Sequence, residues 1–248
     1  MHPPEVREEV LKLVEAGLND CEISRRIGVP RTTVRDMRTP RHMPTRSDVR
    51  TSCPRCGKPA KPTSWDPEDY CELLGLYLGD GHISSLPRTD RLRISLDTQH
   101  TKIVMTTLQL LCRVFPHNKI GVVWAKEGAV CIPHVYSQHL RCMFPQAGPG
   151  KKHNRTIEME KWQSELIAEA PWALLRGLIR SDGCVFINRT GNYEYLSYDF
   201  MNLSQDILDL FCDTCNLVGV RHRRYAKRVR IYRRESVALM QSHVGLKS

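Results

Sequence analysis

The feature that most constrains the fold of this chain is a nine-residue pattern that occurs twice. The two copies are separated by about the length of a small domain. Leu73–Gly81 reads LLGLYLGDG, and Leu175–Gly183 reads LRGLIRSDG. Asp182 follows Asp80 by 102 residues, a period too long for a solenoid repeat and long enough for a complete small domain. We therefore predict a tandem duplication in which one of these segments lies near the start of each copy.

Each repeated segment carries the start and stop signals of a helix. Asp66-Pro67 is expected to begin the first helix and Pro171 the second, because proline suits the first helical turn. Gly81 and Gly183, directly after the acids, are expected to end the helices in a left-handed conformation. A single Asp-Gly is usually just a helix stop or a turn, but two in matching context indicate more.

Small residues four positions apart lie on one face of each helix, so the two helices can approach backbone to backbone. These residues are Gly75 and Gly79 in the first helix, and Gly177 and Ser181 in the second. If the helices pack in parallel, Asp80 comes close to Asp182 at two negative helix ends, and the carboxylates repel each other. Mg²⁺ or Mn²⁺ would relieve that repulsion and would also bind phosphate oxygens. Paired acids and a metal on a basic chain indicate phosphodiester hydrolysis.

The two segments resemble the two motifs of the LAGLIDADG homing endonucleases in their monomeric, two-repeat form. The resemblance extends over about residues 65–248. It implies an α+β fold with two pseudo-symmetric αββαββα repeats, at 65–150 and 151–248, whose sheets form a saddle over DNA. It also implies that Asp80 and Asp182 are catalytic acids that share divalent metals at the scissile phosphates. Leu78 and Arg180 depart from the motif at its sixth position, where the family has an acid.

Family members often carry a lysine near the active site, which suggests two further catalytic candidates. Lys126 and Lys227 each follow an alanine, 46 and 45 residues after the respective acids. We expect them to stabilise developing negative charge. The alternative is that both lysines lie in exposed hairpins.

Two segments with alternating basic residues are expected to form the DNA-binding faces of the sheets. Between residues 91 and 97, Leu92, Ile94 and Leu96 are expected to point inward. The residues expected to face DNA are Arg91, Arg93, Arg228, Arg230 and Tyr232. Arginines two positions apart on a pleated strand suit guanine edges and phosphates in the major groove. The same alternation occurs in any half-exposed sheet.

Positive charge is concentrated in two places. The formal net charge is +10, from 37 Lys and Arg against 27 Asp and Glu. Residues 25–61 hold eleven Lys and Arg against two acids, and residues 221–234 hold eight and no acid. This distribution favours two nucleic-acid contacts, although a solvated basic face would give the same composition.

The first basic segment begins in three predicted short helices, the third over Arg31–Arg38. The string CEISRRIGVPRTTVRDM resembles the helix-turn-helix of resolvase-like and homeodomain-like DNA binders. We predict a DNA-binding domain at 1–46, with Arg31, Thr32, Thr33 and Arg35 at the start of the recognition helix. The alternative is a three-helix bundle that binds protein.

Residues 47–64 are predicted to form a basic linker that contains a Cys-x-x-Cys knuckle. Cys53 and Cys56 have the spacing of a tetrahedral Zn²⁺ site, but no second such pair follows at the spacing of a zinc ribbon. The pair is therefore either half of a zinc site or the remnant of one. No secretory signal is evident, so the ten cysteines are expected to be reduced.

We therefore predict a site-specific DNA endonuclease that makes metal-dependent double-strand cuts. It is expected to act as a monomer on double-stranded DNA, in the cytoplasm at the nucleoid and without a membrane partner. The alternative is a DNA-binding transcriptional regulator that keeps the fold without cleavage, since fold alone does not determine activity. The presence of both acids favours the enzyme.

Overall fold

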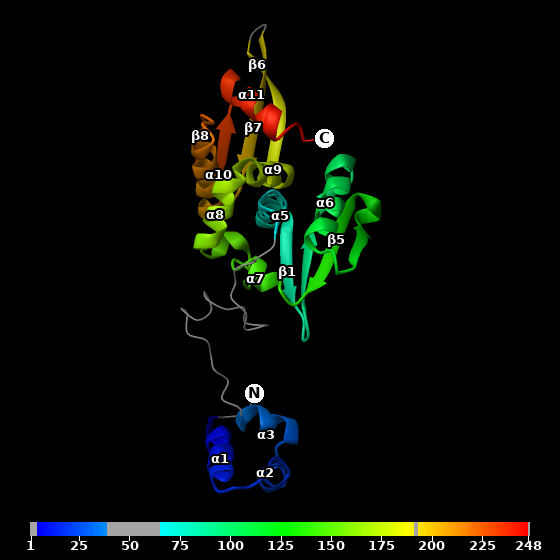
Figure 1. The fold of residues 1–248 in the computed structure, drawn as a ribbon, viewed down its shortest axis with the longest axis vertical. Helices are drawn as coiled ribbons and strands as arrows, with labels where there is room; N and C mark the ends of the chain where they lie inside the picture. Colours follow the sequence, from blue (N-terminus) through cyan, green and yellow to red (C-terminus); the bar gives the residue numbers. More distant parts are fainter. Residues whose placement is uncertain (1–3, 39–64, 191–192, 248) are drawn as a thin grey trace. The chain divides into compact units, whose positions relative to one another are not determined.

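The computed structural model describes residues 4–38, 65–190 and 193–247, which fall in two compact units. The amino-terminal unit consists of three helices around a small apolar core. They are α1 (Pro4–Glu15), α2 (Asp20–Ile27) and α3 (Arg31–Arg38) (Figure 1). The Asn19 side chain caps α2, and Gly28 ends it in a left-handed conformation with φ of 68°. Val10, Ile23, Val29 and Val34 are buried between the helices. The three predicted helices are confirmed, whereas their binding to DNA stays a prediction.

The larger unit consists of two repeats; the second has the predicted αββαββα order, and the first has the same order with one short additional strand before its second helix. The first contains α5 (Pro67–Asp80), β1 (Gly81–Ser85), β2 (Asp90–Ile94), β3 (Leu96–Asp97), α6 (Thr101–Val114), β4 (Ile120–Ala125), β5 (Val130–Ser137) and α7 (Leu140–Met143). The second contains α9 (Pro171–Asp182), β6 (Gly183–Thr190), β7 (Tyr193–Met201), α10 (Gln205–Leu217), β8 (Arg223–Arg224), β9 (Arg228–Ile231) and α11 (Arg234–His243). The turn η1 (Lys126–Gly128) joins β4 to β5, and η2 (Lys152–Asn154) and α8 (Lys161–Glu169) connect the repeats.

The two antiparallel sheets have equivalent strand orders. The first runs β1-β2-β5, with β3 and β4 both pairing with β5, and the second runs β6-β7-β9-β8. Gly81 lies opposite Ile94 in the first sheet, and Gly183 lies opposite Phe200 in the second. Each central helix therefore leads directly into the first strand of its own sheet, at the same register position.

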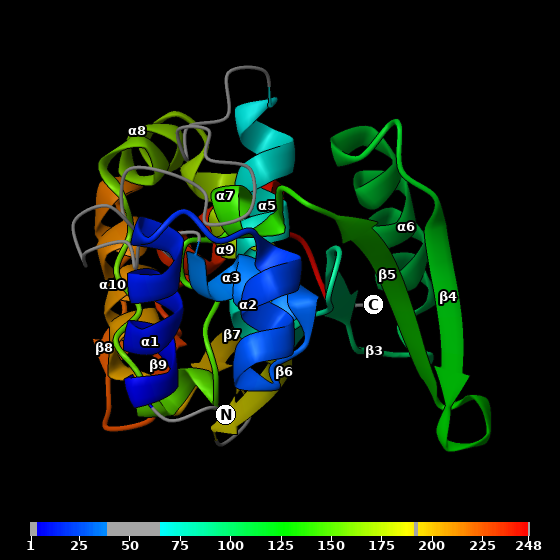
Figure 2. The same cartoon turned by 90° about the horizontal axis from the view of Figure 1, so that it is seen from below.

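The central helices α5 and α9 lie side by side in the middle of the larger unit (Figures 1 and 2). Asp66 caps α5 by accepting from the N–H of Asp69 at 3.0 Å, and prolines begin both helices as predicted. Residues 70–78 are all buried, as are most of the residues between 173 and 181. Burial on nearly all sides fits a helix pair at the centre of one apolar core.

One face of each sheet packs on that core, and the other face is open. Leu92, Ile94 and Leu96 point inward and are 0–3% exposed, as predicted. The first open face contains His82, Ser84, Arg91, Arg93, His134 and Tyr136, which are paired across β1, β2 and β5. The second open face contains Cys184, Phe186, Ser197, Asp199, Arg223, Arg228 and Arg230, on β6, β7, β9 and β8.

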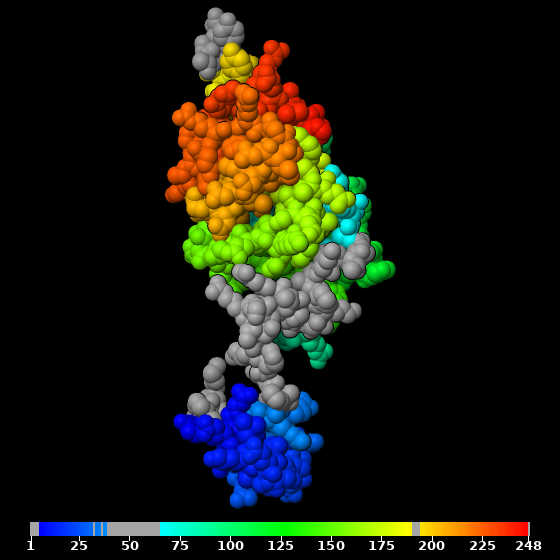
Figure 3. Space-filling model, turned by 60° about the vertical axis from the view of Figure 1, so that its left-hand side comes forward, coloured from blue at the N-terminus to red at the C-terminus, as the bar shows by residue number. Residues whose placement is uncertain are grey.

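Helices cover the outer side of the second repeat. In Figure 3 the yellow-green part of the chain, which includes α8, adjoins the orange part, which includes the end of α10, on one face of the larger unit. None of the described helices has the length and apolar composition needed to cross a membrane. Among the described residues the cysteines are all free, and Cys71, Cys131, Cys142 and Cys215 are buried.

Candidate active site at the ends of the central helices

The central helices contact each other backbone to backbone along the predicted small residues. A Cβ on Gly75 would lie 2.7 Å from the carbonyl oxygen of Leu174, and a Cβ on Gly177 would overlap the carbonyl oxygen of Glu72. Further along, Gly79 packs directly against the side chain of Ser181. Residue numbers increase in the same direction along both helices at these contacts. The helices are therefore parallel, and their carboxyl ends meet.

The glycines after the acids do not have the predicted left-handed conformation. Gly81 has φ −83° and ψ 149°, and Gly183 has φ −88° and ψ 162°, so both are the extended first residues of strands. A Cβ would lie 2.5 Å from the Cα of Tyr77 at Gly81, and 2.6 Å from the Cα of Ile179 at Gly183. Glycine is required there because the chain turns tightly from helix to strand, and not because φ is positive.

The two acids lie at the touching helix ends, largely out of solvent. Burial and, to a lesser extent, the charge of Asp182 raise the pKa of Asp80 from 3.8 to about 6, against the opposing effect of Lys247 and Lys152. Burial also raises the pKa of Asp182, whose Oδ2 accepts a hydrogen bond from Asn202 Nδ2 at 2.7 Å. Each carboxylate therefore lacks much of the solvation that normally stabilises its charge.

Lys152 and Lys247, which we did not predict from the sequence, bind the carboxyl ends of the two central helices in similar ways. Lys152 Nζ donates to the carbonyl oxygens of Tyr77, Gly79 and Gly81 at 2.5, 3.0 and 2.7 Å. Lys247 Nζ donates to those of Ser181 and Gly183 at 2.5 and 2.8 Å. Carbonyl groups at a helix carboxyl terminus attract cations. Burial lowers the pKa of Lys152 to about 8 and also lowers that of Lys247.

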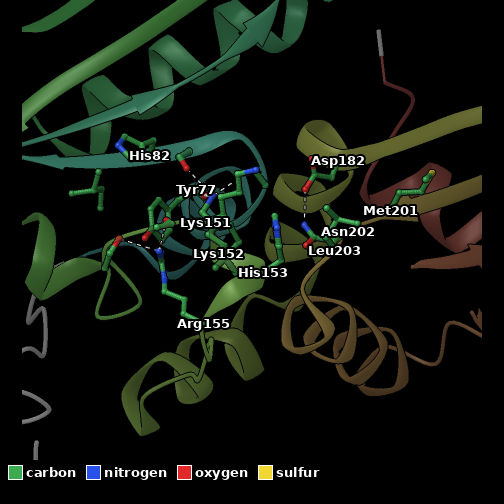
Figure 4. A pocket seen from close by; sticks show the side chains of 16 residues that line it. Tyr77, His82, Lys151, Lys152, His153, Arg155, Asp182, Met201, Asn202 and Leu203 are labelled. Atoms are coloured by element: carbon green, nitrogen blue, oxygen red, sulfur yellow. Dashed lines mark hydrogen bonds between the residues drawn. The ribbon is translucent and has the colours of Figure 1, made fainter. Parts of the chain in front are cut away.

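Each acid lines its own pocket. The first pocket, of about 600 Å³, contains Asp182, and its polar lining comes from both repeats (Figure 4). Its other polar residues are His82, Lys151, Lys152, His153, Arg155 and Asn202. The second pocket, of about 250 Å³, contains Asp80 together with Ser95, Asp97, His100, Arg180 and Lys247. The site is thus a pair of pockets at pseudo-symmetric positions, and each contains one of the two half-buried acids and one of the two lysines that hold the helix ends.

The structure places Lys126 and Lys227 elsewhere. Lys126 lies in η1 with φ of 49°, at the hairpin between β4 and β5. Lys227 lies in the turn before β9, where its carbonyl oxygen accepts from the N–H of Asn202 at 3.2 Å. Neither lysine lines either pocket. Lys152 and Lys247 occupy the neighbourhood of the acids that these two were expected to fill.

The predicted DNA-facing arginines do lie on the open faces. Arg91 lies over the Tyr136 ring, 5.5 Å from its centroid, and Arg93 Nη2 donates to Ser84 Oγ at 3.3 Å. Arg228 and Arg230 lie together on the second open face, where both pair with Asp199. Tyr232, 44% exposed, follows the end of β9.

In the amino-terminal unit, α3 carries the predicted recognition residues. Arg31 and Arg35 are exposed, and Thr33 is half-buried. The side chain of Thr32 lies outside the described residues, as do Cys53 and Cys56. The predicted zinc knuckle therefore stays a prediction.

The donor set at the helix ends fits a hard divalent cation. Each pocket offers the carboxylate of a half-buried aspartate, and oxygen is the ligand type that Mg²⁺ and Mn²⁺ prefer. Within the described ranges, no three His, Cys, Asp or Glu residues gather in a way that could hold a metal ion. A cation there would have only one or two carboxylate ligands, as is usual for Mg²⁺ that also binds phosphate.

The fold is similar to solved structures at low sequence identity. I-DmoI in complex with DNA and Mn is 15% identical with a TM-score of 0.47, over 72% of this chain and 97% of that one. The N-terminal LAGLIDADG domain of DUF199/WhiA is 14% identical with a TM-score of 0.46, over 75% and 87%. The homing endonuclease I-WcaI, bound to its DNA recognition sequence, is 12% identical with a TM-score of 0.46, over 74% and 84%. No protein-family model and no curated protein matches the sequence.

Proposed function

We propose that this chain is a divalent-metal-dependent DNA endonuclease of the LAGLIDADG type that cuts both strands of a specific site. The observation that carries the proposal is the pair of half-buried acids at the touching ends of α5 and α9, each in its own pocket beside a lysine. Burying two carboxylates next to each other costs free energy unless a cation compensates them. Two pockets at pseudo-symmetric positions in one chain provide one acid for each strand, so we propose a monomer.

In this proposal Asp80 and Asp182 would hold Mg²⁺ or Mn²⁺ where the scissile phosphates bind. When bound, the cation would neutralise part of the phosphate charge and lower the pKa of a water molecule bound to it. Asn202, which donates to Asp182, fixes the orientation of that carboxylate. The corresponding pocket at Asp80 contains Asp97, whose Oδ1 accepts from the N–H of Gln99 at 2.9 Å.

The two lysines have different capacities in this scheme. A lysine ammonium has three N–H donors. Lys152 uses three, on three helix-end carbonyls, so its role is to hold the end of α5 and to place a positive charge near Asp182. Lys247 makes two such bonds within the described part of the chain, which leaves one donor for a phosphate oxygen. Lys247 is therefore the better candidate for stabilising charge on the reacting phosphate.

The open faces are proposed to bind DNA on both sides of the cut. Arg91 and Arg93 provide cations on the first face, and Arg228 and Arg230 on the second. We further propose that α3 contacts the same DNA molecule through Arg31 and Arg35, which would lengthen the recognition site.

Selection of cleaved sites from a randomised duplex library tests this function whatever the target sequence is. The full chain is incubated with the library in Mg²⁺, in Mn²⁺ and in EDTA, and the new ends are sequenced. We expect one defined site to be cut with either metal and none in EDTA. The Asp213→Asn variant is the control, because it removes one exposed acid on α10 and should cut normally.

The alternative function, a DNA-binding regulator without cleavage, is favoured by one observation. Lys152 and Lys247 already place two positive charges at the helix ends, so the acids are partly compensated by the protein itself. A protein of this kind would enrich a specific sequence in a binding selection from the same library and cut nothing in any metal.

A further inference from the structure

The second open face contains an acid where a DNA-binding surface would be expected to carry only cations. Asp199, on β7, is 6% exposed and lies directly opposite Arg230 on β9. The equivalent position of the first sheet holds Arg93, since Asp199 precedes Phe200 as Arg93 precedes Ile94 in the shared register. The two faces therefore differ in charge at the same point of the pseudo-symmetric structure.

Asp199 binds both arginines of the second open face that were predicted to contact DNA. Its Oδ2 accepts from Arg228 Nη1 at 3.3 Å and from Arg230 Nη2 at 3.2 Å. Charge-assisted hydrogen bonds are usually shorter, at about 2.7–2.9 Å. Elsewhere in the chain, the fork of Arg113 on Asp69 reaches 2.7 Å. The two bonds to Asp199 are long and share one oxygen atom, so they hold the arginines without fixing them.

The polar network around Asp199 is also incomplete within the described part of the chain. Its other oxygen, Oδ1, is buried and accepts no hydrogen bond, and neither Ser197 Oγ nor Arg230 Nε has a partner. Buried polar atoms without partners cost free energy. The two arginines can therefore exchange Asp199 for better hydrogen-bond acceptors. Phosphates and base edges of DNA are such acceptors.

We propose that Asp199 is a specificity-determining residue that competes with DNA for Arg228 and Arg230. On DNA of the wrong sequence the two arginines stay on Asp199 and add little to binding. On the target, base and phosphate groups positioned by the rest of the interface replace Asp199. An internal acid of this kind lowers affinity for every sequence but lowers it most for non-target DNA. This inference rests on the proposed function in one respect, namely that the second open face binds DNA.

The test measures non-specific binding, so it depends neither on cleavage nor on the identity of the target. Affinity for a random-sequence duplex is measured for the full chain across a range of salt concentrations in EDTA. Each phosphate contact contributes about −0.9 to the slope of log K against log [salt]. We expect Asp199→Asn to make the slope steeper by about 0.9 to 1.8, as one or two arginines become available.

Asp209→Asn is the matched control. It removes the same charge from an acid that pairs with an arginine, Arg224, but Arg224 lies on the helix-covered side of the sheet. Its slope should equal that of the unmodified chain. Equal slopes for Asp199→Asn and Asp209→Asn would overturn the proposal.

Single arginine substitutions keep the inference testable if Asp199→Asn does not fold. Arg230→Gln should leave the non-specific slope within about 0.2 of its original value, whereas Arg91→Gln should flatten it by about 0.9. Flattening by Arg230→Gln as large as that by Arg91→Gln would contradict the proposal. If no form of the chain binds DNA at low salt, the proposed function itself fails, which is a different result.

Discussion

Replacement of Asp80 by Asn should stabilise the metal-free protein at neutral pH, although it removes a proposed catalytic group. In the folded chain the pKa of Asp80 is raised from 3.8 to about 6 by burial and by the charge of Asp182. A rise of about two pH units corresponds to roughly 3 kcal/mol disfavouring the charged form. This is an upper value, because part of the Asp80 side chain remains exposed to solvent. Asparagine resembles the protonated acid and avoids this cost.

The pH dependence has a definite sign. The folded chain binds a proton at Asp80 near pH 6, whereas the unfolded chain binds it near pH 3.8. The free energy of unfolding of the unmodified protein therefore gains a contribution as pH falls from about 7 to 4. The Asp80→Asn variant lacks that contribution. The variant should be more stable by up to about 3 kcal/mol above pH 7, and the difference should disappear below about pH 4.

Urea unfolding followed by circular dichroism in EDTA, at pH 7.5 and pH 4.5, measures this difference. Asp213→Asn serves as the control for the change in net charge, because Asp213 is exposed. The reasoning is refuted if Asp80→Asn is less stable than the unmodified protein at pH 7.5, or if the difference is the same at both pH values.

Three further predictions concern the central helix pair and its carboxyl ends. Gly177→Ala places a Cβ against the backbone of the facing helix and should lower the free energy of unfolding by about 1–3 kcal/mol in the same urea assay. Gly148→Ala is the control, because a Cβ there makes only ordinary contacts and should leave the free energy of unfolding nearly unchanged. Lys152→Met should lower the free energy of unfolding by about 1–3 kcal/mol, because three helix-end carbonyls lose their donor. It should also raise the pKa of Asp182 in a carboxyl NMR titration. The control variant Lys151→Met, at an exposed lysine, should have neither effect. Mn²⁺ should raise the melting temperature of the unmodified protein but not of Asp182→Asn, and an equal rise in both would argue against the cation site.

The central helices and the order of elements were predictable because their signals are local. The start signals, the small residues four apart and the acid at the end all lie within each helix. The alternation of inward and outward side chains around Leu92, Ile94 and Leu96 is likewise contained within a few residues of sequence. Periodicity thus predicted which residues face the core and which helices can approach closely.

The lysines of the site were not predictable in this way. Lys152 follows Asp80 by 72 residues and Lys247 follows Asp182 by 65, so comparison of the two repeats does not align them. The path of the chain between the repeats brings them to the helix ends. Lys126 and Lys227 follow the acids at nearly the same spacing, yet similar spacing along the sequence does not determine which side chain reaches the acids.

Two other differences have the same physical origin. The conformation of Gly81 depends on the strand that follows α5, and an Asp-Gly pair looks the same before a left-handed stop and before a strand. Alternation placed Arg228 and Arg230 on one face, but their partner Asp199 lies on a neighbouring strand 29 and 31 residues away. Such long-range pairing is set by sheet register, which single-strand periodicity does not contain.

The most direct test of the central claim compares cutting with binding on the DNA site selected from the library. Single-turnover cleavage in Mg²⁺ and affinity in EDTA are measured for the unmodified chain, Asp80→Asn and Asp182→Asn. The account predicts that each substitution lowers the cleavage rate by at least about 100-fold while affinity stays within about threefold, since the acids act on the phosphate and the arginines bind the DNA. Cleavage by either variant at the unmodified rate would contradict the assignment of the two acids.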